Sequence, residues 1–129
     1  MKTYLIVGGS SGIGAAVVEE LAQENNVIAT YCKNYKMDIG NVNFHEFNVF
    51  NENPITFIPE KLDGLVYCPG SILLKPFARI NEADFLKDYQ LQVVGATKII
   101  QAALPALKNS EQASVVLYST VAVQRGFTF

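Results

Sequence analysis

The glycine-rich stretch VGGSSGIG, residues 7–14, constrains the fold more than any other part of the sequence. It follows an apolar run at residues 3–7 and precedes a segment with helical periodicity. Gly8 permits a sharp exit from a strand, Gly12 lets the backbone come close to a ligand, and Gly14 lets a helix pack closely on a sheet. The stretch therefore predicts a tight turn between a first strand and a first helix.

The same turn carries donors that a pyrophosphate group requires. The N–H groups of the first helical turn have no partner within the helix, and the helix dipole favours an anion there. Ser10 and Ser11 add hydroxyl donors. The spacing is G-x-x-x-G-x-G rather than the common G-x-G-x-x-G, and glycines in a tight turn can also serve packing alone. A dinucleotide site and a purely structural turn both remain open on this pattern.

Five short apolar runs predict strands, because they are rich in β-branched or aromatic residues and are bounded by Gly, Asn, Pro or Ser. They cover residues 3–7, 26–31, 42–49, 64–68 and 114–119. Residues 33–41 predict a loop or a single turn, since they are short and rich in Gly and Asn. Residues 51–61 contain two prolines and predict an abbreviated crossover.

Two segments have helical periodicity. The segment after Gly12 has an apolar face of Ile13, Ala16, Val17 and Leu21. A longer helix, residues 82–107, is predicted to begin after Asn81, a good N-cap, with acidic residues in its first turn. Its apolar stripe consists of Phe85, Tyr89, Val93, Ala96, Ile100, Ala103 and Leu107. Strands that alternate with helical or crossover segments predict an α/β fold with a parallel sheet.

Composition excludes several classes of protein. The net charge of −2 without a basic block argues against nucleic acid or an anionic membrane as partner. No apolar run approaches the about 18 uncharged residues of a membrane helix. Two separated cysteines and one histidine, His45, argue against a disulfide scaffold or a metal site. We expect a reduced, cytoplasmic, metal-free domain.

These features together resemble the short-chain dehydrogenase/reductase family, which has a Rossmann fold and transfers hydride between NAD(P) and a carbonyl or alcohol. In the family's T-G-x-x-x-G-x-G turn, Val7 replaces the threonine, and the three glycines match. VYCPGS at residues 66–71 stands in the place of the family's N-N-A-G. Only Gly70 matches there, because Tyr67, Cys68 and Pro69 replace Asn-Asn-Ala.

The resemblance also implies two catalytic residues. Residues 91–107 are similar to the family's long interface helix, in which Gln92 takes the place of an asparagine that orders a water near the active site. SVVLYSTVAVQRG looks like the strand that delivers the catalytic serine, which is Ser119 here. The resemblance further implies a homo-oligomer that forms through the helix at residues 82–107.

In the family, a Tyr-x-x-x-Lys motif follows the catalytic serine, and no such pattern follows Ser119 in this sequence. We therefore expect residues 1–129 to be a truncated NAD(P)-binding Rossmann domain. Its doubly wound parallel sheet should have about five strands and lack the C-terminal strands and helices. Such a domain should be inactive alone on small-molecule carbonyl or alcohol substrates. The alternative is a naturally truncated, non-catalytic module that binds a dinucleotide or another protein.

The end of the second predicted strand, ATYCKN, has no acidic residue and is followed by Lys33, which favours NADP, with NAD as the second candidate. Lys33 as an ordinary solvated loop residue remains an alternative, and so does Cys68 as a small apolar filler. The cofactor-binding residues implied by the turn and the resemblance are Gly8, Ser10, Ser11, Gly12, Ile13, Gly14, Tyr31, Lys33, Asn48, Val49, Cys68, Pro69 and Gly70.

Overall fold

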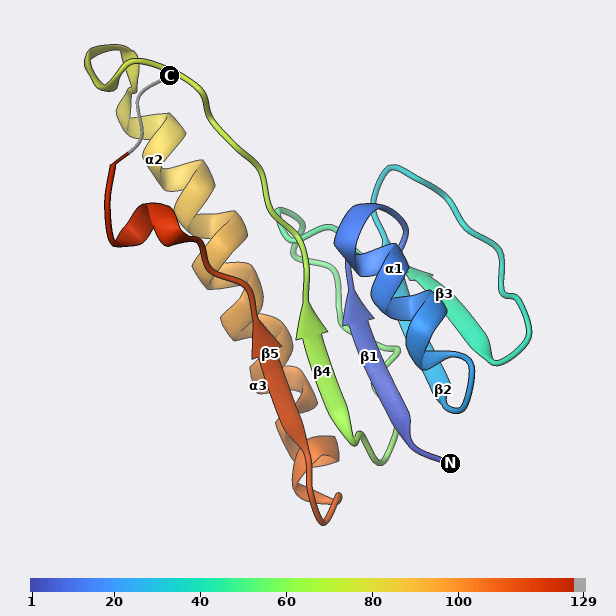
Figure 1. Ribbon diagram of the computed structural model, residues 1–129. Helices are drawn as coiled ribbons and strands as arrows, with labels where there is room; N and C mark the ends of the chain where they lie inside the picture. Colours follow the sequence, from blue (N-terminus) through green and yellow to red (C-terminus); the bar gives the residue numbers. More distant parts are fainter. Residues whose placement is uncertain (127–129) are drawn as a thin grey trace.

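The computed structural model describes residues 1–126, so the last three residues of the predicted domain lie outside the described part. Its centre is a five-stranded parallel sheet in the order β3-β2-β1-β4-β5 (Figure 1). The strands are β1 (Thr3–Val7), β2 (Asn26–Tyr31), β3 (Val42–Glu46), β4 (Gly64–Tyr67) and β5 (Ser114–Leu117). The predicted α/β fold with a Rossmann-like, doubly wound parallel sheet is confirmed.

Helices cover the two faces of the sheet unequally. The helices are α1 (Gly12–Leu21), α2 (Glu82–Tyr89) and α3 (Gly95–Lys108), with a π-helical turn η2 (Gln90–Val94) between α2 and α3. In Figure 1, α1 lies in front of β1 and β2, and α3 lies behind β4 and β5. Two 3-10 turns, η1 (Phe77–Arg79) and η3 (Val121–Val123), complete the helical segments. Residues 33–41 form a loop without a helix, as predicted, and the segment at residues 47–63, which includes the abbreviated crossover predicted at residues 51–61, also contains no helix.

The core consists of two layers, one on each face of the sheet. Along β1, Leu5 and Val7 belong to the layer beneath α3, while Ile6 belongs to the layer beneath α1. This alternation follows from the strand geometry, in which successive side chains point to opposite faces. The α3 layer also contains Leu62, Leu65 and Ile99, each of which has no exposed surface.

The predicted apolar face of α1 is partly wrong. The buried residues of α1 are Gly14 and Val18, whereas Ile13 is 62% exposed. Ile13 lies in the first turn of the helix, at the edge of the sheet, where it lines an open cavity instead of the core. Ala16 is exposed as well, and Val17 is only partly buried. The sequence pattern placed the stripe about one residue away from its true centre.

The predicted stripe of the long helix is correct only in its second half. Ala96, Ala103 and Leu107 are buried in α3, but Phe85, Tyr89 and Val93 are 52%, 58% and 43% exposed. Figure 1 shows the reason, since α2 projects beyond the carboxyl edge of the sheet, where no strand lies beneath it. The π-helical turn adds a second cause, because its wider turns change the angular phase of the residues that precede it.

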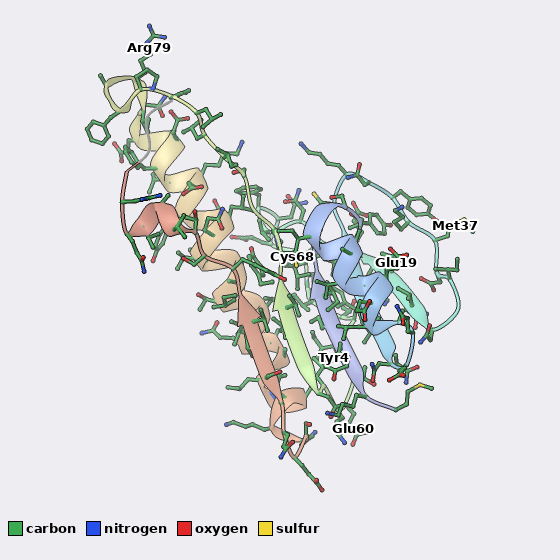
Figure 2. All side chains as sticks on the ribbon, in the orientation of Figure 1. Tyr4, Glu19, Met37, Glu60, Cys68 and Arg79 are labelled. Atoms are coloured by element: carbon green, nitrogen blue, oxygen red, sulfur yellow. The ribbon has the colours of Figure 1, made fainter. Side chains whose placement is uncertain are left out.

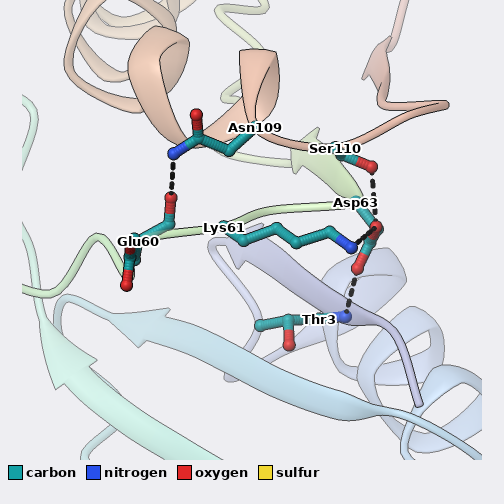
Figure 3. Close-up of polar contacts among 6 residues, drawn as sticks. All are labelled: Thr3, Glu60, Lys61, Asp63, Asn109 and Ser110. Carbon is teal, nitrogen blue, oxygen red and sulfur yellow. Dashed lines mark hydrogen bonds and ion pairs between the residues drawn. The ribbon is translucent and has the colours of Figure 1, made fainter.

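A group of polar contacts joins the amino ends of β1 and β4 to the carboxyl end of α3 (Figure 3). The Asp63 carboxylate accepts the Thr3 N–H at 2.9 Å and the Ser110 hydroxyl at 2.7 Å. The Asn109 amide donates to the Glu60 carbonyl at 2.8 Å. These bonds connect chain segments on both sides of β4. Within the described residues, no helix is both long and apolar enough to cross a membrane.

Candidate functional site

An open cavity of about 670 Å³ lies at the carboxyl edge of the sheet. Residues that follow β1, β2, β3 and β4 line it, because the carboxyl ends of parallel strands meet at one edge. All thirteen residues that the sequence assigns to a cofactor line this cavity: Gly8, Ser10, Ser11, Gly12, Ile13, Gly14, Tyr31, Lys33, Asn48, Val49, Cys68, Pro69 and Gly70. The fold thus brings together four segments that are far apart in sequence.

The glycine turn is anchored to β2 through Thr30. The Gly8 N–H donates to Thr30 Oγ1 at 2.9 Å, and the Gly9 N–H donates to the Thr30 carbonyl at 2.9 Å. Thr30 is 1% exposed and lines the cavity. Since a buried hydroxyl is costly unless it is hydrogen-bonded, this pairing holds the turn in one place relative to β2.

Glycine occupies two positions of the turn, Gly12 and Gly14, for different structural reasons. Gly12 has a φ of +57°, in the left-handed region, and a Cβ at this position would meet no atom within 4 Å. At Gly14 there is no space for a side chain, because a Cβ there would lie 2.0 Å from the Gly8 carbonyl oxygen. Gly14 therefore allows the helix to pack against the turn, while the backbone at Gly12 is open to the cavity.

The N-termini of α1 and α2 are capped differently. At α2, Asn81 accepts the Asp84 N–H at 2.9 Å and Asp84 accepts the Asn81 N–H at 3.1 Å, which forms a capping box. At α1, the Ser11 side chain makes no cap bond, and the first turn holds no acidic residue. The first-turn N–H groups of α1 are thus free to bind an anion in the cavity.

The charges around the cavity are positive. Lys33 and Lys87 line it, and none of the lining residues that the structure describes is acidic. Lys87 comes from α2, and its Nζ lies 5.8 Å from the centre of the Phe50 ring, which also lines the cavity. A chain with a net charge of −2 therefore has a cavity that attracts anions.

Two further lining groups are neutral at ordinary pH. Desolvation raises the pKa of the Cys68 thiol, so Cys68 is a half-buried, protonated side chain, as expected of an apolar filler. The pKa of Tyr31 is also raised, first by desolvation and then by the nearby Glu46 carboxylate. Tyr31 packs edge to face against Tyr35, with 5.2 Å between ring centres. Figure 2 shows Cys68 directly beyond the end of β4.

Tyr67 ties the end of β4 to the π-helical turn. Its hydroxyl donates to the Leu91 carbonyl at 2.5 Å, and burial raises the pKa of Tyr67 to about 12. Leu91 lines the cavity, so this bond fixes part of its wall. A Cβ on Gly95 would come 2.5 Å from the same hydroxyl, which leaves room there only for glycine.

The two predicted catalytic residues lie outside the cavity lining. Gln92 is exposed in η2, and its amide nitrogen lies 3.6 Å from the place that a Cβ on Gly70 would take. Ser119 is exposed two residues beyond β5. Because Tyr67 pairs with Leu117, Ser119 leaves the sheet at the same edge as the segment that follows β4. No contact joins Ser119 to Gln92 among the described residues, and their catalytic roles remain predictions.

Sequence reasoning missed nine of the lining residues, namely Val7, Thr30, Cys32, Asn34, Phe47, Phe50, Ser71, Lys87 and Leu91. Thr30 could have been recognised from the sequence, because it is a polar residue near the end of a strand that is otherwise apolar. Nothing in the sequence indicated that Lys87 and Leu91 line the cavity, since only the tertiary fold brings the long helix to this edge.

Comparison with known proteins adds independent information. No protein-family model matches the chain. A tropinone reductase homolog of Arabidopsis thaliana is 30% identical over 137 residues, which cover 92% of this chain and 51% of the relative. A 3-amino-tetrahydro-pyrrolizinone reductase of Xenorhabdus hominickii is 26% identical and covers 85% of this chain and 43% of the relative. A short chain dehydrogenase family protein of Francisella tularensis superposes with a TM-score of 0.81 at 25% identity, over 94% of this chain and 52% of its own.

The resemblance to the short-chain dehydrogenases/reductases is confirmed. The similar proteins are oxidoreductases, and they agree with the landmarks that the sequence shares with this family. The chain spans about half the length of the short-chain dehydrogenase/reductase relatives that it matches. The cavity that the glycine turn helps to line therefore lies in a short-chain dehydrogenase/reductase fold.

Proposed function

We propose that residues 1–129 are the cofactor-binding portion of an NAD(P)-dependent oxidoreductase of the short-chain type. The observation that carries this proposal is the cavity that all thirteen expected cofactor residues line. The uncapped start of α1 would hold the pyrophosphate, together with the hydroxyls of Ser10 and Ser11. Asn48, Val49 and Phe50, which line the same cavity, would hold the adenine moiety. A bound nicotinamide supplies the hydride that reduces a carbonyl or accepts one from an alcohol.

Titration of two matched glycine variants tests this site. Gly12→Val should abolish binding of NADPH, because its side chain occupies the space through which the pyrophosphate reaches the backbone. Gly40→Val is the control, since Gly40 also has a positive φ, of +58°, and open space around it but lies outside the cavity. Calorimetry should show unchanged affinity for the control. Equal affinities for both variants would remove the glycine turn from the site.

NADP is the proposed nucleotide, with NAD bound less tightly. Lys33 and Lys87 line the cavity and would attract the 2′-phosphate, while none of the described lining residues repels it. Lys33→Glu should reverse or erase the preference for NADPH over NADH. Lys36→Glu makes the same change of charge on an exposed residue of the same loop and should preserve the preference. Equal affinities for the two nucleotides in the parent chain would contradict this preference for NADP.

We further propose that this chain by itself does not reduce carbonyl substrates. Ser119 can offer a hydrogen bond to a substrate oxygen, but a proton donor of the Tyr-x-x-x-Lys type does not follow it in the sequence. The decay of NADPH absorbance with a panel of ketones and aldehydes checks this. Substrate-dependent oxidation that is lost in Ser119→Ala would show that the chain is an active enzyme.

A non-catalytic module remains the second candidate, although no feature of the described residues favours it over the first. For the assembly, the resemblance implies self-association through residues 82–107. The exposed Phe85, Leu86 and Tyr89 of α2 offer apolar surface for such a contact. Leu86→Lys should weaken a contact of this kind, as measured by sedimentation equilibrium.

A further inference from the structure

The long helical segment changes its hydrogen-bond register at η2. The Gly95 N–H donates to the Gln90 carbonyl, which lies five residues earlier. In an α-helix the same N–H would donate to the Leu91 carbonyl, four residues earlier. The π-helical turn therefore releases the Leu91 carbonyl from the donor that it would have in a regular helix. This carbonyl can then accept a hydrogen bond from outside the helix.

Tyr67 supplies that hydrogen bond from the end of β4. Its hydroxyl donates to the Leu91 carbonyl at 2.5 Å, and Tyr67 is only 4% exposed. A buried hydroxyl is costly unless it is hydrogen-bonded, so the protein gains from keeping this carbonyl available to Tyr67. In the α-helical register the Gly95 N–H would compete for the same carbonyl. The Tyr67 bond and the π-helical register therefore support each other.

Gly95 gives the Tyr67 hydroxyl its place next to the helix. A Cβ on Gly95 would lie 2.5 Å from this hydroxyl and 3.0 Å from the Val49 side chain. Any larger residue would push the hydroxyl away from the turn. Tyr67 is one of the positions at which the sequence departs from the family's N-N-A-G, so the resemblance does not predict this contact.

The register of η2 decides which face of α2 meets the cavity. α3 is fixed against the sheet, since Ile99 and Ala103 have no exposed surface. One residue of an α-helix corresponds to about 100° of rotation about its axis. A return of η2 to the α-helical register would take one residue out of the turn and rotate the preceding residues by about this angle relative to α3. Lys87, which lines the cavity, would then turn away from it.

The contact of Lys87 with Phe50 reports this orientation. The Lys87 Nζ lies 5.8 Å from the centre of the Phe50 ring, and both residues line the cavity. Phe50 belongs to the segment that follows β3, so the contact joins the long helix to a separate part of the cavity wall. A rotation of α2 by about 100° would break it.

We propose that Tyr67 is a positioning residue for the cavity. Its hydroxyl holds η2 in the π-helical register and thereby directs the Lys87 ammonium group toward the phosphates of a bound nucleotide. Tyr67 does not line the cavity, so it acts only through the helix. The consequence for the nucleotide rests on the proposed dinucleotide binding, whereas the effect on the helical register does not.

Tyr67→Phe tests the register without any nucleotide, because it removes the hydroxyl and keeps the buried ring. Nuclear magnetic resonance couplings across hydrogen bonds identify the acceptor of the Gly95 N–H. In the parent chain this N–H should couple to the Gln90 carbonyl. In Tyr67→Phe it should couple to the Leu91 carbonyl instead. Coupling to the Gln90 carbonyl that persists in the variant would overturn the proposal.

The proximity of Lys87 to Phe50 gives a second measurement on the same samples. The nuclear Overhauser effect between the Lys87 side chain and the Phe50 ring should be present in the parent chain and lost in Tyr67→Phe. Tyr4→Phe is the matched control, since it makes the same change in β1, outside the cavity lining, and should preserve the effect. Equal loss in both variants would show that the Tyr67 hydroxyl has no specific role.

Calorimetric titration with NADPH tests the consequence for the cavity. Tyr67→Phe should bind NADPH severalfold more weakly than the parent chain. Lys87→Gln should have a similar effect in the parent chain but none in Tyr67→Phe, because Lys87 is already turned away there. Losses that add in the double variant would overturn the positioning role. Absence of NADPH binding by the parent chain would contradict the proposed function and this role, while the acceptor of the Gly95 N–H would still decide the register.

Discussion

The β1–β2 region and β5 belong to the same sheet, yet they differ sharply in how much of their surface the chain covers. Leu5, Val27 and Ala29 are at most 1% exposed, with a helix or a crossover on each face of their strands. All four residues of β5 are exposed. β5 therefore forms mainly through its hydrogen bonds with β4, while β1 and β2 are also held by burial of apolar side chains.

The two parts of the long helical segment show the same difference. α3 buries six residues, among them Ile99 and Ala103, whereas α2 buries none. α2 relies on local interactions instead, namely its capping box and the ion pair of Lys75 with Asp84 at 3.0 Å. Local interactions of this kind contribute less than burial of large apolar side chains. Figure 2 shows how far this arm extends, with Arg79 at its outer end, away from the sheet.

Truncation of one leucine in each region tests the difference in burial between the two regions most directly. Leu65→Ala should lower the free energy of unfolding by about 2 to 5 kcal/mol, because Leu65 has no exposed surface and its loss leaves a cavity. Leu117→Ala should cost about 1 kcal/mol or less, since its side chain is already 57% exposed. Urea unfolding at a concentration where the chain is monomeric measures both. Equal losses would mean that β5 is covered in solution.

Asp63 connects the two regions, and its substitution should have a smaller effect that depends on pH. The Ser110 hydroxyl, followed by the Thr3 N–H, lowers the pKa of Asp63. A folded-state pKa below the unfolded value means that the carboxylate stabilises the fold above about pH 4, and that this contribution is lost as the pH falls through the folded pKa. Asp63→Asn should therefore cost about 1 kcal/mol at neutral pH.

The difference in stability between Asp63→Asn and the parent chain should shrink as the pH falls below about 4. Urea midpoints measured across this range check the prediction. Asp88→Asn removes an exposed carboxylate of α2 and serves as the control for the loss of one negative charge. A difference that stays constant from neutral to acidic pH would show that the Asp63 charge plays no part in joining β1 to α3.

The smallest effect is expected at the outer edge of β3, where Asp38 of the loop at residues 33–41 accepts the Phe44 N–H. Asp38→Ala removes the acceptor of the Phe44 N–H, so exchange of that amide should become severalfold faster while the fold is kept. The Phe47 amide is the internal control, because it donates to the Tyr31 carbonyl on the inner side of β3 at 2.9 Å. Faster exchange at Phe47 as well would show that the loop stabilises the whole strand and does not merely cover its edge.

Much of the fold could be predicted because its signals are local. β1 and β2 have the predicted bounds, and α1 begins at Gly12, one residue before the predicted helical segment. The strand at residues 42–49 is shorter than predicted and ends at Glu46, since the chain then turns from the sheet toward the cavity. The apolar stripe predicted for residues 82–107 is not buried before Gly95. Periodicity indicates which side chains share a face, but not whether another element covers that face.

The sequence by itself determined the order of strands and helices, the turn at residues 7–14 and the set of residues expected around a cofactor. The order of elements and the turn depend on the preferences of short segments and on the position of glycine, which act over a few residues, whereas the cofactor residues outside the turn were implied by the resemblance to the family. Only the tertiary structure decided that Lys87 and Leu91 join the cavity wall, that Thr30 anchors the glycine turn, and that Asp38 binds the Phe44 N–H at the outer edge of β3. Such contacts join residues far apart in sequence, and they arise only when parallel strands bring their carboxyl ends together and packing selects the neighbours.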